Sequence, residues 1–255
     1  MSLFGGHTYM QGAELDHEKR KDYRNAVFVQ VTIIVMAFMM EDLLRLAGIN
    51  RAEKISWLFL QISSGVYLLL LWDMLRNFTR KREMIWSVLL GLSAVYATLF
   101  YVNVSYYSFG VRYDGLRVVC HCTLVLVEFL VIAHAVRDLF HSPRNTVDKL
   151  WGTACIYFMS GYVFASLFHI IHMIEPGAFG QEIGGGHQSL FESLYLSFNS
   201  LVGLDTAYPN SIRLMRNVAV LEGLWGQLYL VLLIGRVLMP ADGELPKRPG
   251  EKDES

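Results

Sequence analysis

The chain has 255 residues, of which 53% are hydrophobic and only 18% are charged, and its formal net charge is −1. Soluble domains usually carry about a quarter charged residues, so this composition excludes an ordinary soluble globular protein. The near-zero net charge also excludes a basic nucleic-acid-binding protein. The three cysteines, Cys120, Cys122 and Cys155, neither complete a disulfide framework nor have the spacing of a zinc finger.

Six apolar stretches without proline are each long enough to form a helix that crosses a membrane, which needs about 20 residues. They are residues 26–46, 55–75, 84–104, 118–140, 150–174 and 214–238. A seventh apolar segment, residues 187–201, is too short to cross and is predicted to be a re-entrant helix or a buried loop. We therefore expect an all-α membrane protein with six transmembrane helices and one short helix.

Polar segments divide the predicted spans into two membrane modules. Residues 26–140 form a four-helix module and residues 150–238 form a second module, and a polar linker at residues 141–149 joins them. Residues 1–25 are a predicted polar N-terminal tail, and residues 239–255 are charged, contain proline and are predicted to be disordered. The C-terminal tail is too short to be a soluble ligand-binding domain.

Lysine and arginine are distributed unequally between the two sides of the predicted membrane. Fifteen of the 22 fall in the terminal tails and in the connections that follow the second and fourth spans, whereas seven fall on the opposite side. Because positive residues concentrate on the cytoplasmic side, both termini are predicted to be cytoplasmic, in a plasma membrane or a bacterial inner membrane. The segment 187–201 would then enter the membrane from outside.

The segment after the fifth span carries the most informative sequence. Residues 189–209 are Ser-Leu-Phe-Glu-Ser-Leu-Tyr-Leu-Ser-Phe-Asn-Ser-Leu-Val-Gly-Leu-Asp-Thr-Ala-Tyr-Pro, and residues 221–230 are Leu-Glu-Gly-Leu-Trp-Gly-Gln-Leu-Tyr-Leu. A helix that stops at mid-membrane leaves its last carbonyl oxygens without hydrogen-bond partners. Such backbone is tolerated only where protein buries it or where it lines a watery pathway. A ring of such oxygens can replace the hydration shell of a cation, and the carboxyl end of a helix adds partial negative charge. One chain supplies one loop, so this interpretation requires partner chains to close the ring.

Residues 150–238 resemble the pore of the tetrameric potassium-channel superfamily, in which a span, a re-entrant helix, a filter and a second span follow in that order. The family filter is Thr-Val-Gly-Tyr-Gly-Asp, commonly followed two residues later by proline, and Val202-Gly203 and Tyr208-Pro209 match this frame without a gap. The resemblance implies a homotetramer in which four pore loops surround a path for a monovalent cation, either potassium or sodium.

Four positions depart from the family filter. Leu201 stands in place of the threonine, Leu204 in place of the aromatic residue, Asp205 in place of the second glycine and Thr206 in place of the aspartate. The ligating hydroxyl and the phenol are lost, and aspartate accepts a positive φ less readily than glycine. We therefore expect altered or weak potassium selectivity, with a ring of Asp205 carboxylates whose mutual repulsion raises their proton affinity.

The resemblance and the residues together predict a set of site positions. The predicted conduction filter comprises Leu201, Val202, Gly203, Leu204 and Asp205, and the predicted pore helix and its support comprise Glu192, Tyr195, Ser197, Ser200, Thr206 and Tyr208.

Two glycines and two histidines of the second module each allow two interpretations. Gly223 and Gly226 in the sixth span are either a gating hinge or small residues that let helices approach. His169 and His172, one helical turn apart, are either an external pH-sensing or metal-sensing pair or interfacial histidines bonded to loop carbonyls.

The fourth span lacks the repeated arginines of a voltage sensor, because no lysine or arginine lies between Arg117 and Arg137. The first module is therefore predicted to be structural or regulatory. Its intramembrane Glu128, His121 and His134 are expected to face protein or water. His121 and His134 also allow a bis-histidine haem site, which would require a second helix with similarly spaced histidines.

The sequence predicts the pore-forming subunit of a cation channel, which conducts passively and catalyses no reaction. We expect no covalently bound cofactor and no resident metal. Two other functions remain open: a non-conducting modulatory membrane subunit with the same architecture, and a haem-binding electron carrier.

Overall fold

The computed structural model describes residues 12–78, 82–110, 113–141, 146–183, 187–204 and 208–238. Within these ranges the chain is helical and contains no strand. The helices are α1 (Gly12–Leu46), α2 (Ala52–Phe78), α3 (Arg82–Phe109), α4 (Asp114–His141), α5 (Thr146–Ile174), α6 (His187–Val202) and α7 (Arg213–Leu238). All six prolines of the sequence lie outside these helices, as expected of a residue that cannot donate the backbone hydrogen bond.

Five of the described helices are long and apolar enough to cross a membrane, which fits an integral membrane protein. The five stretches are Tyr23–Leu46, Ala52–Arg76, Ile85–Tyr106, Asp114–Arg137 and Leu150–Ile174. They coincide with the first five predicted spans. The sixth predicted span, residues 214–238, coincides with α7 and stays a prediction.

Two predicted polar segments are more helical than expected. Helix α1 begins at Gly12, so residues 12–25 of the predicted tail are helical and continuous with the first apolar stretch. Helix α4 continues to His141 and α5 begins at Thr146, so only residues 142–145 of the predicted linker lie outside the described helices. The physical reason is that Glu, Lys, Arg and Asp continue a helix readily in water once an apolar segment has nucleated it. The predicted tail at residues 239–255 lies outside the described residues.

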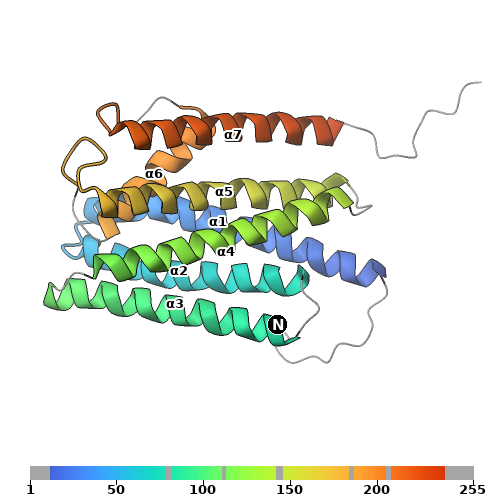
Figure 1. The fold of residues 1–255 in the computed structure, drawn as a ribbon, viewed down its shortest axis with the longest axis horizontal. Helices are drawn as coiled ribbons and strands as arrows, with labels where there is room; N and C mark the ends of the chain where they lie inside the picture. The colour runs from blue at the N-terminus through green and yellow to red at the C-terminus, as the bar shows by residue number, and fades with distance from the viewer. Residues whose placement is uncertain are drawn as a thin grey trace, which may run out of the picture.

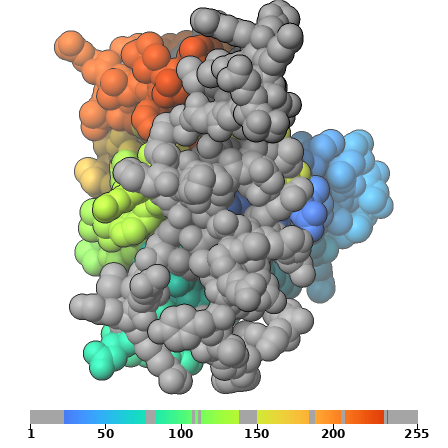
Figure 2. Space-filling view, turned by 90° about the vertical axis from the view of Figure 1, so that its right-hand side faces the viewer, coloured from blue at the N-terminus to red at the C-terminus, as the bar shows by residue number. Residues whose placement is uncertain are grey.

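The long helices run side by side, with α7 and α3 at opposite margins of the bundle (Figures 1 and 2). Helix α6 differs from the rest because it is only 16 residues long, about 24 Å at 1.5 Å per residue. It runs obliquely between α5 and α7 and occupies only one half of their length (Figure 1). The connection after α5 and the first turn of α7 lie together at that end of the bundle.

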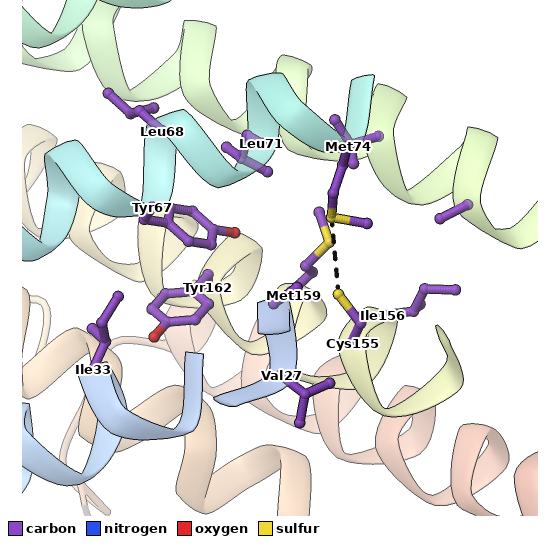
Figure 3. Close-up of a cluster of buried hydrophobic side chains, with 14 of the residues drawn as sticks. Val27, Ile33, Tyr67, Leu68, Leu71, Met74, Cys155, Ile156, Met159 and Tyr162 are labelled. Carbon is purple, nitrogen blue, oxygen red and sulfur yellow. Dashed lines mark hydrogen bonds between the residues drawn. The ribbon is translucent and has the colours of Figure 1, made fainter. Parts of the chain in front are cut away.

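One continuous hydrophobic core joins the two predicted modules. Its buried members come from α1, α2, α3, α4, α5 and α6. At its centre the rings of Tyr67 and Tyr162 lie 4.6 Å apart, and Cys155 Sγ lies 3.9 Å from Met74 Sδ (Figure 3). The Tyr162 hydroxyl donates to the Gln30 carbonyl oxygen of α1. Helix α5 therefore packs against the first module as well as against α6 and α7.

The loop after α5 packs closely against the segment that precedes α7 and is hydrogen-bonded to it. The Ile212 amide donates to the Ala178 carbonyl oxygen at 2.9 Å. Gly180 has a φ of 77°, and a Cβ at this position would overlap the Asn210 carbonyl. Gly177 has a φ of 98°, but a Cβ there would meet nothing within 4 Å.

Replacing Gly180 by alanine is expected to lower the free energy of unfolding by about 1–3 kcal/mol more than the matched change Gly177→Ala. Both substitutions place a side chain at positive φ, so their difference isolates the overlap with Asn210. Chemical unfolding of the two purified variants in detergent micelles measures it. Equal losses of stability would contradict the proposed contact between the two loops.

Candidate functional site

The first half of α6 is anchored to the end of α5 by buried serines. Ser189 Oγ lies 3.4 Å from His169 Nδ1, and Ser193 donates to the carbonyl of Ser189 within the helix. Ser189, Ser193 and Ser197 recur every fourth residue and are all buried. This spacing places the three hydroxyls on one face of α6, against α5 and α7.

The second half of α6 ends in a left-handed cap formed by Gly203, whose φ is 78°. The Gly203 amide donates to the Ser200 carbonyl at 2.9 Å and the Leu204 amide donates to the Asn199 carbonyl at 3.0 Å, which is the Schellman arrangement. Leu201 and Val202 belong to the last helical turn. The non-helical part of the predicted filter therefore begins at Gly203, because α6 ends one residue beyond the predicted short helix.

Side chains of α5 and α7 supply donors for the last two carbonyl groups of α6. The Tyr157 hydroxyl donates to the Leu201 carbonyl at 3.3 Å, and the Gln227 amide donates to the Val202 carbonyl at 3.3 Å. These carbonyl oxygens, which the sequence predicts to face an ion, are thus already bonded within the subunit. Each retains a second lone pair that no hydrogen bond uses.

A polar network ties α5, α6 and α7 together one turn before the end of α6. The Ser197 hydroxyl lies within hydrogen-bond distance of the Gly161 carbonyl and of the Glu222 carboxyl, and Glu222 is completely buried. Trp225 Nε1 donates to Ser160 Oγ at 3.1 Å. The predicted support residue Ser197 therefore contacts both long helices, whereas Glu222 is a partner that no sequence motif indicated.

Two of the three glycines of α7, Gly223 and Gly226, lie against the carboxyl end of α6. A Cβ at Gly226 would overlap the Leu201 carbonyl, and one at Gly223 would lie 3.2 Å from the Ser200 carbonyl. Close packing therefore accounts for glycine at both positions. The hinge interpretation stays a prediction.

The chain returns from the end of α6 to the first turn of α7 through Tyr208. Its buried hydroxyl donates to the Glu192 carboxylate of α6, and its ring lies 4.9 Å from that of Phe179. Burial, and then the hydrogen bond to Glu192, raise the pKa of Tyr208 above the ordinary tyrosine value. The phenol therefore keeps its proton and its donor role at neutral pH.

Other predicted site residues lie at the surface of the subunit or outside the described residues. Val202 is 52% exposed and Leu204 is 64% exposed, and Tyr195 is exposed on α6. Ser200 is buried against α7. Asp205 and Thr206 lie outside the described residues.

The predicted histidine pair does not form one site. His169 faces the first module, where its ring lies 4.8 Å from that of His121, whereas the ring of His172 lies 5.4 Å from that of Phe179. Both histidines are buried. Groups of three or more potential metal ligands are absent from the described residues.

A cavity of about 120 Å³ lies between the first module and α5 and α6. It is lined by polar groups on one face of α4, namely Arg117, His121 and Glu128, and by His169 of α5. Within the described part of the chain, Glu128 Oε2 and His121 Nδ1 have no hydrogen-bond partner. These residues therefore face protein, as the sequence predicts.

The fourth helix does not present its two histidines together. His134 is exposed and its Nδ1 lies 2.7 Å from the Leu130 carbonyl, while His121 is buried in the cavity. Thirteen residues at about 100° each place them on different faces of α4, so they do not form the matched pair that a haem site needs.

Comparison of the chain with protein-family models, with curated proteins and with solved structures finds no match.

The variant Gly226→Ala is expected to weaken the packing of α6 on α7 and to lower the free energy of unfolding by about 1–3 kcal/mol, because the added methyl group overlaps the backbone. Gly235→Ala in the same helix is the control, since a Cβ there meets nothing within 4 Å. Unfolding of both variants in detergent micelles tests the difference. Equal stability of the two variants would argue against close contact at Gly226.

The variant Tyr208→Phe is expected to cost about 1.5–3 kcal/mol, because it removes the donor to a carboxylate. Tyr101→Phe, at an exposed position of α3, is the control. Because the folded-state pKa of Tyr208 is raised, its contribution is complete below the ordinary tyrosine pKa of about 10 and is lost as pH rises through the raised value. Unfolding measured at neutral and at alkaline pH checks both statements.

Proposed function

We propose that this chain is the pore-forming subunit of a homotetrameric cation channel, in which α5, α6 and α7 build the pore and α1 to α4 pack at its periphery. In this proposal both termini are cytoplasmic and α6 enters the membrane from outside. The permeant ion is a monovalent cation, potassium in preference to sodium, with weaker selectivity than an intact potassium filter gives.

The depth of α6 is the observation that carries the proposal. Its first turn contacts His169, near the end of α5, and its last turn contacts Tyr157 and Gly226, which lie well inside α5 and α7. The chain then returns to the same end, because Ile212 pairs with Ala178 in the loop after α5. A segment that enters halfway and returns is the geometry of a re-entrant pore helix.

The hydrogen bonding at the end of α6 supports the same interpretation. Non-helical backbone at membrane depth is tolerated only where protein buries it or where it lines water. Protein donors satisfy the carbonyls up to Val202. Gly203 and Leu204 are exposed on the single subunit, so the proposal places them beside a water-filled axis between four copies.

The charge at the end of α6 favours a cation over an anion. The carboxyl end of a helix carries partial negative charge, and Asp205 follows it in the sequence. Four such ends around one axis would attract cations and repel anions. The exposed apolar face of α7, which includes Leu221, Leu224 and Leu228, is the surface that would meet a neighbouring subunit or lipid.

A non-conducting subunit of the same architecture is the second candidate. The observation that favours it is the internal bonding of the Leu201 and Val202 carbonyls, which leaves fewer free oxygens for an ion than a potassium filter presents. Whether the purified chain conducts by itself separates the two candidates.

Reconstitution of the purified chain in liposomes is expected to give a cation flux, with bi-ionic reversal potentials that indicate weak selectivity for potassium over sodium. Val202→Trp is expected to abolish this flux while preserving folding, because the side chain is exposed on each subunit and four indoles would fill the axis. Leu90→Trp, at an exposed position of α3, is the matched control and should conduct normally.

Tetrameric protein without flux would favour the non-conducting candidate. Monomeric protein, or equal flux from both tryptophan variants, would contradict the proposed pore.

A further inference from the structure

Among the described residues, Glu222 is the carboxyl-bearing residue with the smallest exposed surface. It lies in the middle of α7 with none of its surface exposed. Its Oε1 contacts Ser197 Oγ of α6, and its Oε2 has no hydrogen-bond partner among the residues that the structure describes. The described residues offer it no salt bridge within 4 Å. A negative charge at this place would therefore be uncompensated, which is among the most costly arrangements in a protein interior.

Counting hydrogens at Ser197 determines which group carries the proton. The hydroxyl of Ser197 lies 2.7 Å from the Gly161 carbonyl oxygen and also contacts Glu222 Oε1. A serine hydroxyl has one hydrogen and two lone pairs, and a carbonyl oxygen only accepts. If Ser197 donates to Gly161, the second short contact is a hydrogen bond only when Glu222 supplies the hydrogen.

If Glu222 is ionised, two buried oxygen atoms near Ser197 lack a side-chain hydrogen-bond donor. If Ser197 donated to a Glu222 carboxylate, the Gly161 carbonyl would face the serine lone pairs at 2.7 Å without a hydrogen between them. The second carboxylate oxygen would also be buried without a donor. Protonation of Glu222 leaves the Ser197 hydrogen available to the Gly161 carbonyl and also removes the buried charge. The geometry therefore favours the protonated acid.

We propose that Glu222 is a neutral carboxylic acid that donates to Ser197 and thereby positions the carboxyl end of α6 between α5 and α7. The chain of hydrogen bonds runs from Glu222 of α7 through Ser197 of α6 to Gly161 of α5. Ser197 lies one turn before Leu201, so this network fixes the turn from which the exposed segment leaves. The protonation state stands on the contacts alone, whereas its consequence for conduction rests on the proposed channel function.

The groups that face Glu222 explain why it keeps its proton. From α6 the contact is the hydroxyl of Ser197, and from α5 the titratable neighbour is the phenol of Tyr157. Neither carries positive charge. Loss of the proton would place a carboxylate against the Ser197 oxygen and compete with the Gly161 carbonyl for the single hydrogen of that hydroxyl.

Infrared difference spectroscopy of the full chain in lipid at neutral pH tests the proposal, because the carbonyl stretch of a carboxylic acid is separate from that of a carboxylate. The spectrum of the native chain minus that of Glu222→Gln is expected to contain a carboxylic-acid band that shifts in deuterium oxide. Glu175→Gln, at an exposed position after α5, is the control and should remove only carboxylate signal.

Further variants distinguish a change of the hydrogen bond from misfolding of the chain. Glu222→Gln keeps a donor to Ser197 and is expected to retain the thermal stability of the native chain, whereas Glu222→Ala is expected to lose it. In Ser197→Ala, which keeps the acid but removes its acceptor, the carboxylic-acid band should shift to the frequency of a free acid.

Loss of only a carboxylate signal in Glu222→Gln, or an unshifted band in Ser197→Ala, would overturn the proposal. The infrared result does not depend on ion flux. A carboxylic-acid band in a chain that does not conduct would therefore contradict the proposed function and leave the assignment of Glu222 in place.

Discussion

The structure depends on satisfying the carbonyl groups at the end of a helix that stops inside the protein. In water the last four carbonyls of a helix find partners freely, but in a bilayer each unsatisfied group costs several kcal/mol. Helix α6 meets this constraint with two backbone donors, from Gly203 and Leu204, and two side-chain donors, from Tyr157 and Gln227. The last two come from different helices, so α6 can end here only while both α5 and α7 are in place.

The same constraint explains why α7 must approach α6 so closely. Gln227 reaches the Val202 carbonyl because Gly226 and Gly223 carry no side chain between the two helices. Ser197 and Glu222 then fill the contact one turn earlier with a hydrogen bond where other helix pairs would use apolar side chains. At the other end of α6, Ser189 meets His169, whose ring also borders the polar cavity of the first module. The short helix is thus connected to both halves of the molecule.

Sequence reasoning located the helices well because span length and proline position are local properties. The first five spans and the short helix at residues 187–201 follow from the apolar runs, and the structure extends that short helix by a single residue. The apolar pattern did not indicate that α1 would continue through the charged residues 12–25. The sixth span, residues 214–238, coincides with α7 and stays a prediction.

The sequence indicated which segment forms the candidate site but not which side chains bond to it. Positions 201 to 203 were identified by resemblance, but the partners of their carbonyls, Tyr157 and Gln227, lie 44 and 25 residues away and no periodicity indicates them. The role of Glu222 could not be predicted for the same reason, because it depends on a contact with Ser197 on another helix. Ser197 itself was predicted as a support residue, and the spacing of Ser189, Ser193 and Ser197 is a sequence signal from which a buried polar face could have been predicted.

The depth of Val202 in the membrane tests the account most directly. A spin label attached at this position of the lipid-reconstituted chain reports both depth and access to water-soluble relaxation agents. The account predicts a label that lies near the middle of the bilayer and is nevertheless accessible to a water-soluble agent. A label at the level of the lipid headgroups, or one that only oxygen dissolved in lipid can reach, would contradict it.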